Sequence, residues 1–190
     1  MTIWDQIAVA ATDAYGAIQQ RDELAGFLEY LDARLPPAPA ILEIGSDAGG
    51  TLYAWRKLRP RAHVVAVSLA AGVYATPRPI DPHGAVVLDA DSHEPAARAR
   101  ARELLGRPPA LVFVDGDHSL AGCRADCEWA SELLEPGGLL ALHDVSPHSV
   151  DGIGCPDVWG ELLDDRRYAW PQSFVKPGAG WGGIGVLTRA

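Results

Sequence analysis

Short runs of apolar residues alternate with amphipathic stretches over most of the chain. We predict a strand at each run with almost no polar position, at 40–44, 63–67, 85–88, 110–114 and 139–142. Strands that are apolar throughout are typical of a parallel sheet covered by helices on both faces. The alternation therefore predicts a Rossmann-like, doubly wound α/β fold with right-handed crossovers.

The N-terminal segment, residues 1–37, differs from the rest. Residues 3–18 and 21–34 carry apolar side chains at spacings of three and four, so we expect two helices there. A proline-rich stretch separates them from residues 38–190, the expected Rossmann-like core of a single domain. Because variable surface segments usually shape specificity, we expect residues 1–37 and the Gly/Pro-rich loop 70–84 to form a lid over substrate.

Helices are also expected between the strands of the core. We predict them at about 51–58, at about 94–105, and from Ser119 to the turn at 136–138. Ser92 is expected to cap the second of these helices and Ser119 the third, because serine side chains accept hydrogen bonds from the first backbone N–H groups.

The last third of the chain changes its pattern. A short helix is predicted near 157–163, and two strands follow closely at about 168–175 and 183–187. Two adjacent strands of this kind form an antiparallel hairpin, which we place at one edge of the sheet. The whole prediction is a mostly parallel, seven-stranded sheet with a C-terminal antiparallel hairpin.

Composition and charge limit the class of partner. The 190 residues carry a formal net charge of −9, which argues against a nucleic-acid partner because phosphates would be repelled. No stretch reaches the ~20 apolar residues of a membrane helix. The cysteines (Cys123, Cys127 and Cys155) are odd in number and no export signal is visible, so we expect reduced thiols in a cytoplasmic protein. An apolar N-terminal helix could pair with a second copy to give a homodimer.

A glycine-rich turn follows the first predicted strand. The stretch from Glu43 to Thr51 reads Glu-Ile-Gly-Ser-Asp-Ala-Gly-Gly-Thr, with the acid inside the strand. Glycines here let the backbone approach a ligand and turn into a helix N-terminus. The pattern is Glu-x-Gly-x-x-x-Gly, not the Gly-x-Gly-x-x-Gly of nicotinamide-binding domains.

This signal resembles motif I of class I S-adenosylmethionine (SAM) dependent methyltransferases. Two further stretches resemble a bacterial group of these enzymes, related to the macrocin and catechol O-methyltransferases and to cephalosporin-hydroxylase-like proteins. One is a strand ending Asp-Gly-Asp-His-Ser at 115–119, and the other is Pro-Gly-Gly followed by a strand ending in His143-Asp144. The terminal Gly-Gly-Ile-Gly-Val-Leu at 182–187 fits the last strand of that group.

The resemblance implies a set of cofactor contacts. Gly45, Ser46 and Gly49 would bracket the methionine end of SAM, and Glu43 would orient the loop. Further contacts are expected from loops after other strands and before the second helix: Gln19, Asp91, Ser92 and Asp115.

One departure from the group concerns the second strand. It usually ends in an acid that binds the ribose hydroxyls, whereas this chain has Ser68. A neutral hydroxyl forms a weaker bond than a carboxylate.

The strand-end residues Asp115, His143 and Asp144 are the expected catalytic centre. In the resembling O-methyltransferases such residues bind a divalent metal, which would lower the pKa of a substrate hydroxyl. A carry-over makes all three ligands of Mg²⁺ or a transition metal. The alternative is a metal-free site with His143 as general base, titrating near pH 6.5. His118 could be a second base, but because it lies directly before a helix we expect it to satisfy backbone groups.

The predicted function is SAM-dependent methylation of a small molecule at a hydroxyl, in bacterial secondary metabolism. One alternative is a protein of this fold that binds SAM without methylating, and Ser68 keeps it open. A nicotinamide-dependent dehydrogenase would need Gly-x-Gly-x-x-Gly and an acid after the second strand, and the sequence has neither.

Overall fold

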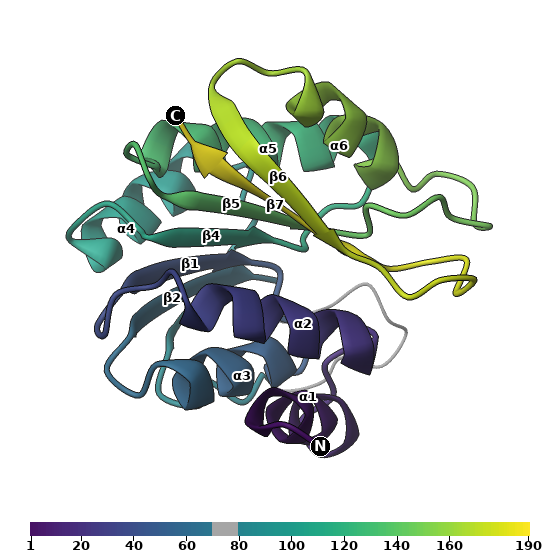
Figure 1. Cartoon of the computed structure of the whole chain (residues 1–190). Helices are drawn as coiled ribbons and strands as arrows, with labels where there is room; N and C mark the ends of the chain where they lie inside the picture. Colours follow the sequence, from purple (N-terminus) through teal and green to yellow (C-terminus); the bar gives the residue numbers. More distant parts are fainter. Residues whose placement is uncertain (70–79) are drawn as a thin grey trace.

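A seven-stranded sheet forms the centre of the molecule, with helices on both faces (Figure 1). The computed structural model describes residues 1–69 and 80–190. Within them the strand order is β3-β2-β1-β4-β5-β7-β6. Strands β1 to β5 are parallel, while β7 is antiparallel to both β5 and β6. The predicted fold class, including the antiparallel hairpin at one edge, is confirmed.

The strands and helices alternate as the apolar runs predict, with small shifts at their ends. The strands are β1 (Ala40–Ile44), β2 (His63–Ser68), β3 (Val86–Asp89), β4 (Leu111–Val114), β5 (Leu139–His143), β6 (Tyr168–Phe174) and β7 (Ile184–Arg189). The helices are α1 (Ile3–Asp13), α2 (Arg21–Asp32), α3 (Gly50–Leu58), α4 (Pro95–Leu105), α5 (Leu120–Leu133) and α6 (Cys155–Leu163).

Two apolar clusters, one on each face of the sheet, explain why the central strands are apolar throughout. Along β4, Leu111 and Phe113 join the cluster under α1, α2 and α3, whereas Val112 and Val114 join the cluster under α4, α5 and α6. Successive strand residues point to opposite faces, so a strand covered on both sides has no solvent-facing position for a polar side chain. The three cysteines are buried and free, in the second cluster.

The first predicted helix is shorter than expected. It ends at Asp13 rather than near residue 18, and Gly16 takes a φ of 77°, which a right-handed helix does not allow. Helix α2 is part of the core, since Leu24, Phe27 and Leu28 are fully buried. Such packing is typical of a fixed layer. The lid role of residues 1–37 remains a prediction, and most of the second expected lid segment, 70–79, lies outside the described residues.

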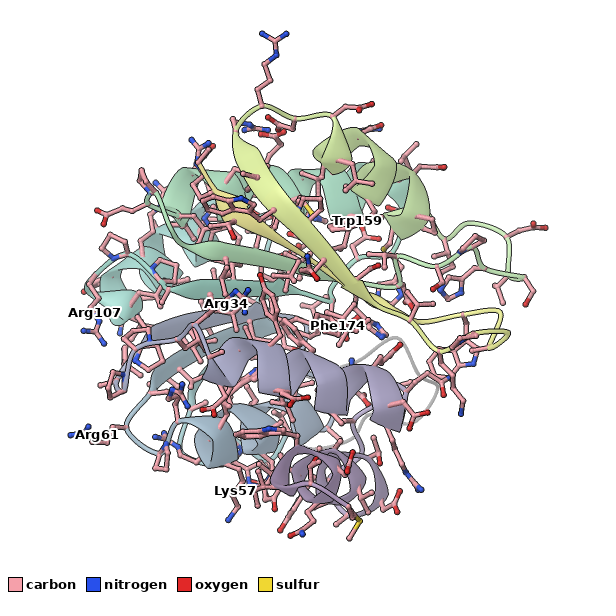
Figure 2. The ribbon with its side chains drawn as sticks, in the orientation of Figure 1. Arg34, Lys57, Arg61, Arg107, Trp159 and Phe174 are labelled. Atoms are coloured by element: carbon pink, nitrogen blue, oxygen red, sulfur yellow. The ribbon has the colours of Figure 1, made fainter. Side chains whose placement is uncertain are left out.

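Aromatic side chains fix the hairpin β6–β7 to helices on both faces. Phe174 of β6 lies over α2, where a Cβ at Gly26 would be 3.1 Å from its ring, and Trp159 of α6 lies on β7 (Figure 2). A Cβ at Gly185 would meet the Trp159 ring at 2.7 Å, so the strand needs a glycine there. These contacts hold the start of β7 beside the end of β5.

Candidate active site

The carboxyl ends of β1, β4 and β5 meet where the strand order reverses. The chain runs outward from β1 to β3 and then returns to place β4 beside β1, the position at which open α/β sheets bind ligands. Asp115 directly follows β4 and Asp144 directly follows β5. Asp144 has a φ of 61°, a left-handed conformation that aspartate tolerates better than most residues. Strained backbone of this kind clusters at functional sites.

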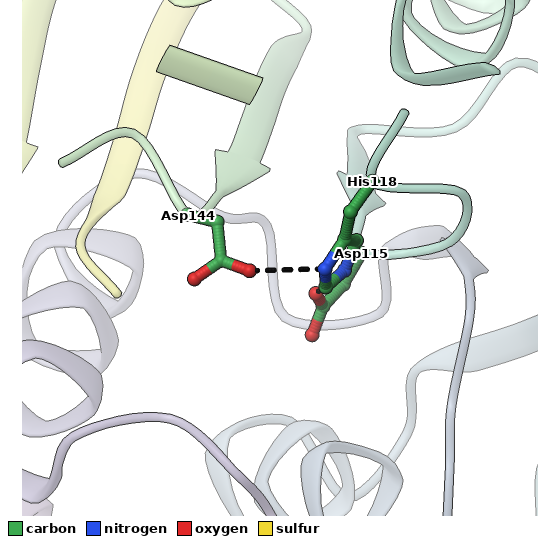
Figure 3. Close-up of side chains that lie close together, drawn as sticks. All are labelled: Asp115, His118 and Asp144. Carbon is green, nitrogen blue, oxygen red and sulfur yellow. Dashed lines mark hydrogen bonds and ion pairs between the residues drawn. The ribbon is translucent and has the colours of Figure 1, made fainter. Parts of the chain in front are cut away.

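The imidazole of His118 joins the two carboxylates (Figure 3). Its Nε2 lies 3.1 Å from Oδ1 of Asp115, and its Nδ1 lies 3.2 Å from Oδ2 of Asp144. One ligand atom from each residue lies within 4.8 Å of the others, and no second group of this kind occurs among the described residues. The expectation that His118 satisfies backbone groups is wrong for its ring.

These contacts shift the pKa of Asp115 and the pKa of His118. Burial would raise the pKa of Asp115, but His143 and His118 beside it lower that pKa to about 2. The hydrogen bond to Asp115 raises the pKa of His118 to about 9, against the opposing effect of burial. Without another cation, the carboxylate of Asp115 is therefore paired with the imidazolium of His118.

His143 does not belong to this group of ligand atoms. Its side chain is 4% exposed, its Nδ1 lies 3.1 Å from Asp115 and its Nε2 lies 3.1 Å from Oε1 of Glu23. Burial would lower its pKa, but Asp115, Glu23 and Asp144 raise the pKa well above the ordinary histidine value. A base that titrates near pH 6.5 does not fit this environment, whereas the role of His143 as a metal ligand remains a prediction.

Gln19 reaches the same site from the segment before α2. Its Nε2 donates to Oδ2 of Asp115 at 2.6 Å, while its buried Oε1 has no hydrogen-bond partner within the described part of the chain. A buried amide oxygen without a donor suits a ligand that brings one. The methionine end of SAM carries such a donor in its ammonium group. The placement is compatible with the predicted role of Gln19.

The glycine turn is built for contact with protein backbone. Gly45 has a φ of 83°, and a Cβ there would lie 2.0 Å from the carbonyl oxygen of Asp115. Gly49 has a φ of 95°, and a Cβ there would lie 2.1 Å from the carbonyl oxygen of Asp81. The expected reason for these glycines, room for the methionine moiety, is therefore incomplete. Each first permits two chain segments to meet.

The side chain of Glu43 is hydrogen-bonded to two residues of helix α3. It is fully buried and accepts hydrogen bonds from the hydroxyl of Thr51 and the indole N–H of Trp55. Burial raises its pKa to about 8, although these hydrogen bonds oppose the shift. Glu43 thus fixes α3 under the turn, in line with an orienting role.

Ser68 holds the same turn from β2. Its Oγ accepts a hydrogen bond of 3.1 Å from the backbone N–H of Ser46, and both residues are buried. One lone pair of the Ser68 hydroxyl is therefore already used within the protein. A ribose contact from Ser68 stays a prediction.

The loop after β3 is tied to helix α5. Ser92 does not cap α4, whose N-cap is Glu94; its hydroxyl donates to Oδ1 of Asp126 at 2.7 Å. Asp91 is exposed and accepts from the N–H of His93. Asp126 is fully buried, its pKa is raised by burial, and its Oδ2 has no partner among residues 1–69 and 80–190. Adenine contacts of Asp91 and Ser92 remain predictions.

From the sequence, His118 was considered only as a possible second base, and Glu23 was missed. His118 carried a signal, because it lies in the Asp-Gly-Asp-His stretch that follows a strand. Glu23 carried none, since an acid three residues into a helix is explained by capping, and it does accept from the N–H of Gln20. Only the folded chain brings Glu23 to His143.

Comparison with known proteins identifies the class. A family model described as a methyltransferase domain matches residues 42–145, which include the glycine turn and both strand-end carboxylates. The chain therefore belongs to this family of methyltransferase domains.

Solved structures share the fold at low sequence identity. MycE, a methyltransferase from the mycinamycin biosynthetic pathway solved with Mg and S-adenosylhomocysteine (SAH), has a TM-score of 0.72 and 14% identity. This chain is covered completely but spans only 54% of the MycE chain. TomG, an O-methyltransferase from Streptomyces achromogenes solved with SAM, has a TM-score of 0.56 and 20% identity, with 100% and 91% of the chains covered.

One curated relative has a different kind of substrate in its name. Ribosomal RNA large subunit methyltransferase E of Rhizorhabdus wittichii is 28% identical over 177 residues, covering 85% of this chain and 73% of the relative.

Across the described ranges, no helix is long and apolar enough to cross a membrane.

Proposed function

We propose that the protein transfers the methyl group of SAM to a hydroxyl of a small molecule, with a divalent cation held by Asp115 and Asp144 and with His118 beside it as the proton acceptor. The observation that carries this proposal is the convergence of these three side chains at the strand-order reversal. Carboxylate oxygens are ligands that both Mg²⁺ and Mn²⁺ accept.

The chain's own residues supply orientation and a proton acceptor. Gln19 and Asp115 would hold the methionine end of the cofactor, while Asp144 and His118 would face the acceptor. A bound cation would lower the pKa of the acceptor hydroxyl. His118 is the candidate base because its side chain is 34% exposed, whereas that of His143 is 4% exposed. Alignment supplies much of the remaining rate, since the methyl of SAM is already activated.

Methylation of ribosomal RNA is the second candidate, favoured by the named relative. Against it stands the formal net charge of −9, because RNA-binding surfaces gain most of their affinity from basic residues on phosphates. A protein of this fold that binds SAM without methylating is the third candidate, and its binding of SAM would not require Asp144.

Calorimetry of SAH binding with and without Mn²⁺, followed by methyl transfer from labelled SAM, separates the three. We expect SAH to bind, and transfer to small phenols or sugars to be lost with a chelator. Asp144→Asn should lower turnover at least 100-fold, while Asp151→Asn, an exposed neighbour in the next loop, should not change it. Transfer to RNA alone, or Asp144→Asn with parental turnover, would contradict the proposal.

A further inference from the structure

A buried glutamate on helix α2 lies behind both carboxylates of the site. Glu23 is 2% exposed and its Oε1 accepts from the N–H of Gln20 at 2.7 Å. The same oxygen lies 3.1 Å from Nε2 of His143, and Oε2 accepts from the N–H of Gly183 at 2.6 Å. Burying a carboxylate away from water costs free energy unless other contacts replace those with water. The contacts of Glu23 with Gln20, His143 and Gly183 replace them.

The first connection runs through His143 to Asp115. The imidazole lies between two carboxylates, with Nε2 on Glu23 and Nδ1 on Oδ1 of Asp115 at 3.1 Å. Gln19, four residues before Glu23, donates to Oδ2 of Asp115. The segment around the start of α2 thus contacts both carboxylate oxygens of Asp115. Gln19 contacts Oδ2 directly, and Glu23 contacts Oδ1 through the imidazole of His143.

The second connection runs through Gly183 to the segment after Asp144. The N–H of Val145 donates to the carbonyl of Gly183 at 3.3 Å, and the N–H of Ser146 donates to the carbonyl of Gly182 at 2.9 Å. Glu23 fixes the N–H of the same Gly183. Because Asp144 already has a left-handed φ, its direction depends on how the following backbone is held.

We propose that Glu23 is a positioning residue, which sets the relative placement of Asp115 and Asp144 through His143 and Gly183. This inference rests on the proposed function, because it concerns the same site. It goes beyond the matched family region, since residues 42–145 contain neither Glu23 nor Gly183. Outer groups that orient ligand side chains typically change metal affinity by 10- to 100-fold when removed.

The test compares Glu23→Gln with Glu29→Gln, an exposed glutamate on the same helix. His118 is the reporter because it contacts Asp115 and Asp144. We expect the ring NMR signals of His118 to move in Glu23→Gln and not in Glu29→Gln, with Mn²⁺ affinity about tenfold lower in the first variant only. In a His143→Gln background, adding Glu23→Gln should change Mn²⁺ affinity much less, because one connection is already broken.

A folded Glu23→Gln variant whose His118 signals match the parent would overturn the proposal. Glu23→Asp is the second variant, to be used if the first does not fold. It keeps the charge but withdraws the carboxylate from His143 and Gly183, so it should move the His118 signals too. If the parent binds SAH but no Mn²⁺, the metal half of the proposed function fails, and the His118 signals still decide the role of Glu23.

Discussion

Nδ1 of His118 lies 3.2 Å from Oδ2 of Asp144, so an imidazole stands at the place where a cation shared by the two strand ends would be bound. This contact joins the segments that follow β4 and β5. It also means that a proton and a metal ion compete for the same carboxylates.

The first prediction concerns the pKa of His118. Without a divalent ion this pKa is raised to about 9 by Asp115, so the ring keeps its proton until the pH rises through 9. A bound cation would neutralise the carboxylates and repel the imidazolium, so we expect the pKa to fall. An NMR titration of the ring protons with and without Mg²⁺ measures this, with His63, at the start of β2, as the internal control.

The same shift has a consequence for the rate. If His118 accepts the proton of the acceptor, the rate should rise with pH through the pKa of His118, and a bound ion should move that rise to lower pH. A rise near pH 6.5 that persists in His118→Gln would return the role of base to another group.

The second prediction concerns Gly45. Gly45→Ala should be more destabilising than Gly137→Ala by roughly 2 kcal/mol or more, because both glycines have a φ near 85° but only the first has a carbonyl at 2.0 Å from the added Cβ. Urea unfolding of the two variants gives the difference. Equal losses would show that the turn can move away from Asp115.

The third prediction concerns the pH dependence of stability. Glu43 binds its proton up to about pH 8 in the folded protein but only to about pH 4.5 when unfolded. Its contribution to the free energy of unfolding should therefore fall as pH rises between these values, by up to ~1.4 kcal/mol per pH unit.

Glu43→Gln removes this titration while keeping partners for its neighbours, since an amide can accept from Trp55 and donate to Thr51. We expect a flatter dependence of stability on pH in the variant, measured by urea unfolding at pH 5, 6.5 and 8. Parallel curves for variant and parent would show that Glu43 is ionised in the folded state.

The fourth prediction concerns Ser68. In Ser68→Asp one carboxylate oxygen can take over the bond from the N–H of Ser46, leaving the other for the ribose. We expect SAH to bind about tenfold more tightly, as a charged acceptor is worth ~1.5–3 kcal/mol. Ser173→Asp, on the exposed edge strand, controls for added charge. Unchanged affinity in both would show that another group serves the ribose.

The sheet could be predicted from the sequence because its signal is local. Runs such as 111–114 are apolar at every position, which is the pattern of a strand buried on both faces of a sheet. Strand ends then locate Asp115 and Asp144, since parallel strands finish at one edge.

The contacts of the site could not be predicted in the same way. Ser92 looks like a helix cap, but its hydroxyl bonds to Asp126, 34 positions away. His143 looks like a free base at a strand end, yet its ring contacts Glu23, which lies 120 positions earlier in the sequence. No spacing rule reaches so far along a chain, because such pairs are set by the packing of α2 on the sheet.

The hydrogen bond between Glu23 and Gly183 joins residues 160 positions apart, and it has a consequence for how the protein folds. Strands β1 to β5 can pair as soon as they emerge during synthesis, but β5 lacks its antiparallel neighbour until β7 follows. Contacts of such long separation form late, because the entropy of closing the loop must be met first. A nascent chain would thus hold a nearly complete sheet well before it could bring Asp115 and Asp144 into register.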